Sequence, residues 1–330
     1  MTATNPCRTF SSPFSIIECG STSASVWIFR RSAVSCGVLP AYFPLRIAGA
    51  ISRVNKLLKE LIQAMNLAEV KRAIVARKLK WVAGETPVAA AALTSGQFGL
   101  RRTSLNAPAL QVATMMPEAF RGTRPAKIDW RTEGRVSPIR SQDTCGSCVA
   151  FATCAAMESA LAIQENEPAS VDLSEADLFY CGCGDCCDTG WDFIPALGRA
   201  SQGVGLEADF PYVVGSTCKS IPPAVKVSSW KTAHSADDRR WALVRGPVVA
   251  GMRVFDDFRY YKSGVYEHAT GDEIGLHAVC VVGYDDDASC WIVKNSWSSS
   301  WGEDGFCRIA YGQCGLDQEF PFIAIEVERL

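Results

Sequence analysis

The chain has 330 residues, of which 48% are hydrophobic, and its formal net charge is −2. This length predicts two domains, or one domain with an appendage, and the apolar share is sufficient for a sizeable core. The small net charge favours no class of partner, no long basic run indicates nucleic acid, and no apolar run is long enough to span a membrane.

Residues 1–50 differ in composition from everything that follows. They are rich in serine and contain arginine, and Glu18 is the only acid between Met1 and Lys59. Such a composition is typical of a transit or export segment. The apolar stretch Ala33–Leu45 makes a poor signal core, however, because two prolines interrupt it. We therefore expect either a targeting segment or a disordered extension here.

Residues 51–124 begin with apolar side chains at helical spacing. This pattern predicts two helices between Val54 and Leu79, and Asn66 followed by Glu69 is typical of a capping box that opens the second helix. The stretch from Gly84 to Arg124 has few large apolar residues. It cannot form a core of its own, so we expect a linker or a strap that lies on a partner surface.

From Pro125 onward the pattern is that of a globular domain. The Ala-rich run Val149–Ala162 contains no Gly or Pro and predicts a buried helix. Four β-type runs follow, namely Gly246–Met252, His277–Tyr284, Cys290–Lys294 and Phe320–Val327. A helix followed by strands predicts an α+β domain over residues 125–330, with a helical lobe over about 125–235 and a β lobe over about 236–330.

Two cysteines, Cys145 and Cys148, lie directly before the predicted helix, and Gln142 lies upstream of them. Cys148 is expected at the helix N-terminus, where unpaired N–H groups and the helix dipole lower the pKa of a thiol. Cys148 is therefore a candidate nucleophile. A metal-binding pair or a disulfide explains the same spacing, so the local sequence alone does not decide between the three.

A thiol nucleophile needs a base, and the base needs a group that orients it. Of the three histidines, His277 lies in an apolar run at the start of a predicted strand, where a lone histidine is often structural. Asn295 and Trp297, at the end of the next strand, favour a catalytic role. The Asn295 amide can accept a hydrogen bond from the imidazole, and the Trp297 ring can shield that bond from water.

His277 and Asn295 lie 129 and 147 residues after Cys148. In these residues the chain resembles the papain-like cysteine peptidases, in which both follow the nucleophile by roughly 130–150 residues. The resemblance covers about Pro125 to Leu330. Further matching segments are Ile128–Arg131, Leu173–Leu178, Phe210–Tyr212, Gly246–Val248 and Trp301–Gly305. It implies a papain-like fold in which a helical lobe carries the nucleophile and a β-barrel-like lobe carries the base.

The resemblance also implies the chemistry. Cys148 and His277 would form a thiolate–imidazolium pair oriented by Asn295, and Gln142 with the N–H of Cys148 would stabilise the oxyanion. Peptides or proteins would be hydrolysed through an acyl-enzyme, with no cofactor and no metal. The substrate cleft would include four further residues, namely Gly190, Trp191, Leu276 and Trp297.

Papain-like enzymes are made as zymogens, so residues 51–124 are expected to be a pro-segment that inhibits the enzyme of its own chain. Trp81–Gly84 resembles the short cathepsin B-type pro-segment. Two alternatives remain: an acyltransferase or transglutaminase with the same Cys–His chemistry, and a non-catalytic peptide-binding relative. Among peptidases we favour an endopeptidase, because no basic loop near the cleft indicates an exopeptidase.

The chain departs from the family pattern beside the expected catalytic residues. Val149 stands where a Trp is usual, and Asp143 and Ser298 stand where glycines are usual. Thr189 replaces the first of two adjacent glycines. These changes are expected to alter the cleft and the oxyanion loop without removing the nucleophile or the base.

Twelve of the fifteen cysteines lie between Cys145 and Cys314, a density that indicates an oxidising compartment, lysosome-like or extracellular. The resemblance pairs Cys145 with Cys187 and Cys181 with Cys218, which leaves Cys148 free. The resemblance does not specify the pairing of five further cysteines, namely Cys183, Cys186, Cys290, Cys307 and Cys314.

Two of these extra cysteines, Cys183 and Cys186, form either a local disulfide or part of a zinc or iron–sulfur site. Cys290 and Cys307 are candidate cross-strand neighbours. Cys314 also locates a specificity residue, because the family sets the floor of its main specificity pocket five residues later, at Glu319. A carboxylate there would admit Arg as well as apolar side chains. Alternatively, Glu319 points to solvent.

Overall fold

The structure is a computed structural model that describes residues 67–91, 98–111 and 123–330, all of which belong to one compact unit, Leu58–Leu330. The predictions for residues 1–50, for a helix starting at Val54 and for a cap at Asn66 lie outside these residues. No helix in the described part of the chain combines the length and the apolarity that crossing a membrane requires.

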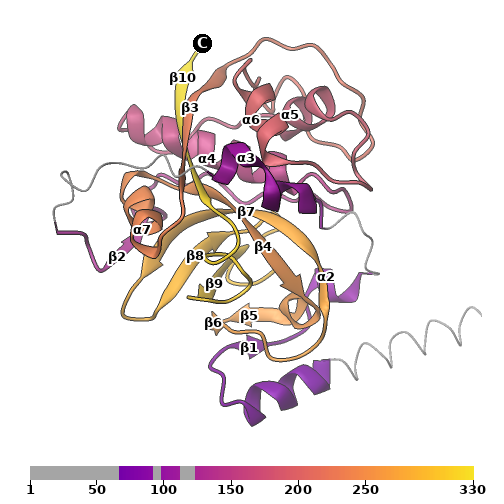
Figure 1. The fold of residues 1–330 in the computed structure, drawn as a ribbon. Helices are drawn as coiled ribbons and strands as arrows, with labels where there is room; N and C mark the ends of the chain where they lie inside the picture. Colours follow the sequence, from indigo (N-terminus) through magenta and orange to yellow (C-terminus); the bar gives the residue numbers. More distant parts are fainter. Residues whose placement is uncertain (1–66, 92–97, 112–122) are drawn as a thin grey trace, which may run out of the picture. The chain divides into compact units, whose positions relative to one another are not determined.

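The chain folds into two lobes, with helices gathered in one and a large sheet in the other (Figure 1). The helical lobe is centred on α4 (Cys148–Gln164), which is one residue longer at its start and two at its end than predicted. Fourteen of its seventeen residues are buried, since its small Ala side chains let the sheet approach closely. Around α4 lie η2 (Arg102–Asn106), α3 (Pro108–Gln111), α5 (Glu175–Gly182) and α6 (Phe193–Ala200).

The start of α5 shows how polar groups are satisfied inside this lobe. The Ser174 hydroxyl caps the helix by accepting a hydrogen bond from the Asp177 N–H at 2.9 Å. The buried Asp177 carboxylate in turn receives Arg199 of α6 at 2.8 Å and the Gly205 N–H at 2.9 Å. One carboxylate therefore joins α5, α6 and the following loop.

The second lobe is built on an eight-stranded sheet, in which β2 pairs with β7 and the other strands follow the order β3-β10-β4-β7-β8-β9-β6. Neighbours along it are antiparallel except β6 and β9. The strands are β2 (Lys127–Asp129), β3 (Val225–Ala233), β4 (Val248–Phe255), β6 (Val265–Tyr266), β7 (Glu273–Asp285), β8 (Cys290–Lys294), β9 (Phe306–Ala310) and β10 (Phe322–Arg329). Two short helices accompany the sheet, α7 (Ala236–Arg245) and η4 (Asp256–Tyr260).

Strand β7 is the element shared by the two lobes. It pairs with β4 and β8 and also contacts α4 of the helical lobe. In its register with β4, His277 lies opposite Met252 and Ala278 opposite Gly251. Strand β8 ends at Lys294, directly before Asn295. The sheet therefore brings His277 and Asn295 to the face that meets the start of α4.

The four predicted strands are present, three of them with shifted ends. β8 has the predicted bounds, whereas β4 starts two residues later than predicted, after Gly246 and Pro247. Proline has no N–H for a ladder, which explains this later start. The sequence interpretation did not identify α5, α6, α7, β3 or β9, because these are short segments with mixed periodicity.

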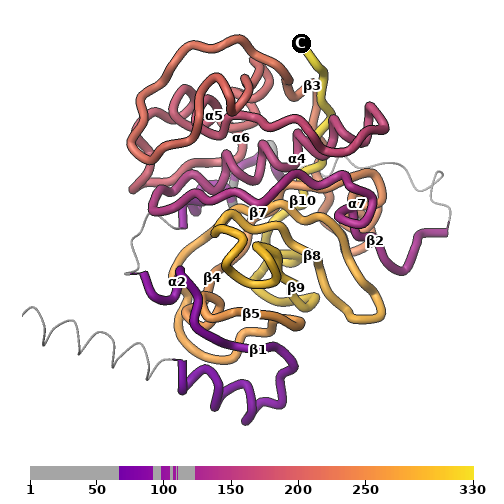
Figure 2. The backbone as a smooth tube through the Cα atoms, turned by 180° about the vertical axis from the view of Figure 1, so that it is seen from behind, coloured from indigo at the N-terminus to yellow at the C-terminus, as the bar shows by residue number. Residues whose placement is uncertain are grey.

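The described part of the N-terminal segment packs on the β lobe. Residues 67–76 are helical, β1 (Val82–Ala83) pairs with β5 (Tyr261–Ser263), and α2 (Pro87–Ala90) follows (Figure 2). Trp81 is 2% exposed, and its ring lies 5.1 Å from that of Tyr266. The Thr86 hydroxyl accepts from the Ala89 N–H and donates to the carbonyl of Arg259 at 2.6 Å. This segment is thus part of the core of the β lobe.

Candidate active site

Cys148 is the first residue of α4 and is completely buried. The loop before it is fixed to the neighbouring loop by the disulfide Cys145–Cys187 and by a hydrogen bond of 2.8 Å from the Gly146 N–H to the Cys187 carbonyl. The Cys148 sulfur accepts from the Ala278 N–H at 3.4 Å. Thus the nucleophile predicted on one lobe touches the residue that follows His277 on the other.

His277 is completely buried, and its Nε2 donates to Oδ1 of Asn295 at 2.8 Å. The same oxygen accepts from the Ser296 N–H at 2.9 Å, which fixes which end of the amide faces the ring. The Trp297 ring lies 5.0 Å from the imidazole and covers this bond. The other ring nitrogen, Nδ1, has no hydrogen-bond partner among the residues described.

Burial decides the protonation of both groups in this structure. It raises the pKa of Cys148 to about 11, although hydrogen bonds from the backbone of Ala278 and Gly99 oppose the shift. It lowers the pKa of His277 to about 4, against the hydrogen bond to Asn295. Near pH 7 the thiol and the imidazole are therefore both neutral.

Gln142 connects the two lobes beside the thiol. Its side-chain Nε2 donates to the Cys145 carbonyl at 2.8 Å, and its Oε1 accepts from the Ser296 hydroxyl at 2.7 Å. Its backbone N–H donates to the Ser296 carbonyl at 2.9 Å. Since the amide has two N–H bonds, one of them remains for a further acceptor.

A strap formed by residues 98–102 lies directly over the thiol. Trp191 donates to the carbonyl of Gly99 at 2.7 Å, and Arg101 donates to the carbonyl of Trp191 at 3.1 Å. Leu100 donates to the carbonyl of Leu276 at 3.2 Å and forms a parallel bridge with Trp191. The strap therefore binds both walls of the cleft through its backbone.

Glycines make this close approach feasible. A β-carbon on Gly99 would lie 2.0 Å from the carbonyl oxygen of Gly146, and one on Gly190 would lie 2.1 Å from that of Gly99. Phe98 packs edge-on against Trp297 with ring centroids 6.0 Å apart. The sequence interpretation expected a strap but did not locate it, and Phe98-Gly99-Leu100 was the available signal: one glycine between two large apolar residues.

Comparison with known proteins agrees with this arrangement. Residues 124–323 match the model of the papain family cysteine proteases. The chain belongs to the papain family of cysteine proteases.

Fruit bromelain of Ananas comosus is 34% identical over 201 residues, which are 57% of this chain and 55% of bromelain, so the match spans little more than half of that relative. Digestive procathepsin L 3 of Tenebrio molitor has a TM-score of 0.70 at 25% identity and covers 84% of this chain and 92% of its own. Procathepsin B S9 of Trypanosoma congolense has a TM-score of 0.68 at 25% identity, with 79% and 98% covered.

Both solved structures are proenzymes, and the N-terminal region of this papain-family chain resembles a pro-segment.

The departures from the family pattern keep a glycine-like backbone at two positions. Asp143 and Ser298 have φ angles of 51° and 72°, in the left-handed region that glycine adopts most easily. Asp143 is further held by its carboxylate, which accepts from the Ser141 hydroxyl at 2.7 Å.

The cysteines of this papain-family chain divide by lobe. The structure contains the disulfides Cys145–Cys187 and Cys181–Cys218, the pairs that the resemblance implies, and also Cys183–Cys186. These bonds leave no thiolate for a metal in this stretch and agree with folding in an oxidising compartment. Cys148 and five further cysteines are free and buried, namely Cys154, Cys280, Cys290, Cys307 and Cys314.

The interpretation of Cys290 and Cys307 as cross-strand neighbours is wrong. They lie on adjacent strands but out of register, because Cys290 is opposite Ala310 and Cys307 is opposite Val293. Both thiols are free. The sequence showed two β-type segments but not how far one was shifted along the other.

Glu319 lies over the turn at Gly315, and its carboxylate is bound by Arg253. The Nε of Arg253 donates to one oxygen at 2.8 Å, and its Nη2 donates to the other at 2.5 Å. The sequence interpretation did not identify Arg253, which lies on β4 without a motif to mark it. An Arg side chain of a substrate would therefore have to compete with the Arg253 guanidinium for the Glu319 carboxylate.

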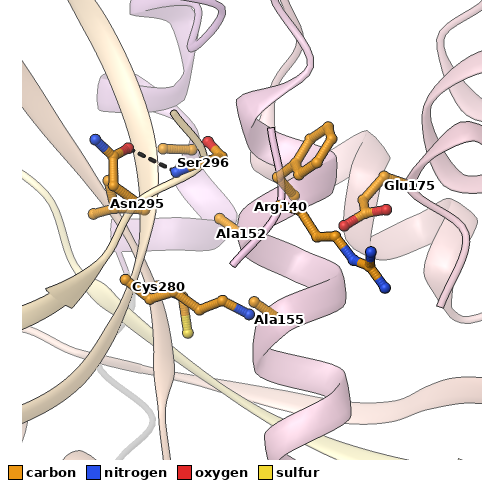
Figure 3. Close-up of a pocket in the computed structure, with 11 residues that line it drawn as sticks. Arg140, Ala152, Ala155, Glu175, Cys280, Asn295 and Ser296 are labelled. Atoms are coloured by element: carbon orange, nitrogen blue, oxygen red, sulfur yellow. Dashed lines mark hydrogen bonds between the residues drawn. The ribbon is translucent and has the colours of Figure 1, made fainter. Parts of the chain in front are cut away.

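A small pocket lies between the lobes, where α4 meets β7 and the end of β8 (Figure 3). Ala152 and Ala155 of α4 face Cys280 of β7 across it, and Glu175 of α5 lies nearby with Arg140 (Figure 3). Burial raises the pKa of Glu175 well above its usual range. A buried carboxyl group whose charged form is disfavoured therefore lines this pocket.

A second buried carboxylate ties the lobes together. Lys294 donates to the Ser137 hydroxyl at 2.8 Å, and this hydroxyl donates to the carboxylate of Glu158 on α4. Because Lys294 directly precedes Asn295, the link fixes the strand end that holds the imidazole. The signal in the sequence was a single acid, Glu158, inside an Ala-rich buried helix.

Proposed function

We propose that the chain is a cysteine peptidase made as an inactive precursor, with Cys148 as nucleophile, His277 as general base and acid, and Asn295 as the residue that orients His277. One observation carries this proposal: the peptide segment of His277 and Ala278 reaches the Cys148 sulfur, while Asn295 holds the far side of the imidazole. The unpartnered Nδ1 of His277 is the atom that accepts the thiol proton.

The strap keeps this pair inactive because it excludes water. With the strap in place, the pKa values of about 11 for Cys148 and about 4 for His277 keep both groups neutral. When the strap leaves, solvent stabilises the thiolate and the imidazolium, and the proton moves from Cys148 to Nδ1 of His277. Removal of the strap is thus the activating step.

The reaction then proceeds by acyl transfer. The Cys148 sulfur attacks a peptide carbonyl carbon, and the oxyanion is bound by the Cys148 N–H and the second N–H of Gln142 Nε2. The imidazolium of His277 protonates the leaving amine, which leaves an acyl-enzyme. Water, deprotonated by His277, attacks the thioester, and the acid is released with the thiol restored.

The strap is not itself cleaved, because its backbone places an N–H group at the Cys148 sulfur. The Gly99 N–H is the group directed at this sulfur. The Gly99 carbonyl is bound by the Trp191 N–H at 2.7 Å and so lies away from the oxyanion donors. A backbone in this direction covers the nucleophile without placing a scissile bond on it.

The domain limits follow from the same proposal. Residues 51–124 are the pro-segment and inhibit their own enzyme, and residues 125–330 are the peptidase domain, which works without a cofactor. Gly190, Trp191, Leu276 and Trp297, which contact the strap, line the substrate cleft. Peptides and proteins are the substrates, an endopeptidase is favoured, and the compartment is lysosome-like or extracellular.

Labelling by an epoxysuccinyl thiol-protease inhibitor tests this function. We expect rapid labelling of a chain that starts at Pro125 and little labelling of the full chain. Cys148→Ala must abolish labelling, whereas Cys154→Ala, a matched change of another buried thiol on α4, must retain it. Absence of labelling in the shortened wild-type chain would rule out the peptidase, and equal labelling of both lengths would rule out inhibition by the strap.

A further inference from the structure

The side chain of Leu100, the strap residue after Gly99, is buried among apolar groups of the β lobe, and we call the place that it occupies between Gly251, Leu276 and Phe320 the Leu100 pocket. A β-carbon on Gly251 would lie 2.4 Å from the ring of Phe320 and 2.7 Å from the side chain of Leu100, so these groups meet over the glycine. On the neighbouring strand β7, the carbonyl of Leu276 accepts a hydrogen bond from the Leu100 N–H. Leu100 is 5% exposed and Phe320 is 1% exposed. The wall that meets the inserted side chain is therefore aromatic and aliphatic.

Arg253 lies at the rim of this pocket. It is two residues after Gly251 on β4 and opposite Leu276 of β7, so all three side-chain positions share one face of the sheet. Its guanidinium binds both oxygens of Glu319, at 2.8 and 2.5 Å, and its third nitrogen binds Glu273. The hydrogen bond to Glu319 is the main reason why the pKa of Arg253 lies above its usual range.

Glu319 is turned away from the apolar wall by this contact. Its carboxylate folds back over Gly315, where a β-carbon would lie 2.9 Å from Oε1. Phe320, the next residue, points its ring to Gly251 and Leu100 instead. A fork-like pair of charge-assisted bonds is among the strongest polar contacts available in a protein. The carboxylate is thereby withheld from a side chain that enters the pocket.

We propose that Arg253 is a specificity-determining residue, which holds Glu319 and Glu273 at the rim so that the pocket accepts apolar side chains and rejects Arg. This inference rests on the proposed peptidase function. An entering Arg has to replace Arg253 on Glu319 and meets a second guanidinium at the same site. Rejection by an existing like charge is a common source of specificity.

The side chains of the strap agree with this preference for apolar groups over Arg. It inserts Leu100 and keeps Arg101 and Arg102 outside the pocket. Arg102 pairs with the Glu273 oxygen that Arg253 leaves unused, and Arg101 donates to the Thr189 carbonyl and hydroxyl, at 3.1 Å each. Of the three consecutive side chains, the apolar one is in the pocket and the two cationic ones are at its edge.

Two fluorogenic peptides test the proposal, Leu-Arg and Arg-Arg, which differ only in the residue before the one whose carbonyl is attacked. The activated wild-type enzyme is expected to favour Leu-Arg in kcat/KM by at least about tenfold. Arg253→Gln frees the Glu319 carboxylate and is expected to reduce this ratio by roughly tenfold or more, through faster cleavage of Arg-Arg. Arg253→Gln/Glu319→Gln is expected to restore the preference.

Arg329→Gln is the matched control, because Arg329, the last residue of β10, binds Glu165 by a similar fork, at 2.6 and 2.7 Å, and Glu165 follows the end of α4 that is opposite Cys148. It must leave the ratio unchanged. If Arg253→Gln fails to fold, Arg253→Met, which keeps an unbranched side chain but removes the charge and the fork, must shift the ratio in the same direction. An unchanged ratio in an active Arg253 variant overturns the inference. No cleavage of either peptide by the wild type overturns the proposed function, and the inference with it.

Discussion

The two sides of the cleft are held by different kinds of bond. On the helical side, three disulfides fix the loops around Cys148, and all three have at least one cysteine between residues 145 and 187. On the β side, His277 lies on strand β7 of a hydrogen-bonded sheet, and Asn295 directly follows strand β8. The ring of His277 lies beside Trp297, which belongs to a cluster of aromatic rings. Four cysteines of the β lobe are free and buried, namely Cys280, Cys290, Cys307 and Cys314.

The difference follows from the backbone on each side. The loop from Gln142 to Ser147 and the loop from Cys183 to Gly190 belong to no sheet and have few backbone hydrogen bonds of their own. A covalent link limits the conformations of such loops in the unfolded chain. Strand β7, by contrast, is paired throughout its length, with β4 along residues 273–281 and with β8 and β2 along residues 280–285. A base on that strand is positioned without any disulfide.

The largest expected effect comes from breaking the aromatic support of the β side. Trp301 is fully buried, and its ring lies 5.0 Å from that of Trp297, 5.1 Å from Phe258 and 5.5 Å from Tyr261. Trp301→Ala is expected to lower the free energy of unfolding by about 5 kcal/mol, the upper end for a Trp→Ala change. Urea unfolding of a Cys148→Ala background, which prevents self-cleavage, measures this loss.

Trp301→Phe serves as the control for that change. It keeps a ring in the cluster, so we expect less than half of the loss seen for Trp301→Ala. Equal losses for the two variants would show that the ring contacts do not stabilise the β side. The β side would then not be held in place by its aromatic contacts, in contrast to what we infer for it here.

The next effect comes from removing the covalent support of the helical side. The disulfide Cys145–Cys187 closes a loop with a sequence separation of 42 residues. The chain-entropy relation gives about 4 kcal/mol for a loop of this size, so Cys145→Ser/Cys187→Ser is expected to lose about that amount. The thermal midpoint and the unfolding free energy of the non-reduced proteins measure it.

A disulfide that closes a much shorter loop in the same lobe provides a comparison for this loss of stability. The Cys183–Cys186 bond spans only three residues, and the same relation gives about 2 kcal/mol for Cys183→Ser/Cys186→Ser. Thermal unfolding must therefore rank the two variants by loop length. The reverse order would mean that strain or local contacts, and not the unfolded chain, determine the effect.

The same comparison shows what could be predicted from the sequence. Helix α4, strand β8 and the spacing of Cys148, His277 and Asn295 were accessible, because periodicity and motif spacing are local or nearly local signals. The family match and the two-lobe α+β fold agree with the prediction made from those motifs.

What the sequence did not reveal depends on contacts between distant segments. The register of Cys290 against Cys307 is decided by how β8 and β9 pair, which no local pattern specifies. The fork of Arg253 on Glu319 joins residues 66 positions apart. Gly99 was likewise inconspicuous until Gly146 and Gly190 were found against it. Each of these features requires the fold before it can be recognised.

The remaining prediction concerns pH, to which the two sides respond with opposite sign. Burial raises the pKa values of Glu158 and Glu175 on the helical side, so the stability that these acids contribute is present at low pH and is lost as pH rises through their folded pKa values. Burial lowers the pKa of His277 from 6.5 to about 4 on the β side. The unfolded chain therefore binds a proton at His277 between pH 6.5 and 4 that the folded chain does not bind.

The contribution of His277 to stability must therefore fall as the pH decreases from about 6.5 to 4, by about 3 kcal/mol at most. We expect the unfolding free energy of Cys148→Ala, minus that of Cys148→Ala/His277→Gln, to decrease by up to this amount between pH 7 and pH 4. The subtraction removes the opposite response of Glu158 and Glu175, because both proteins retain those acids. A difference that stays constant with pH would contradict a neutral, strap-covered imidazole.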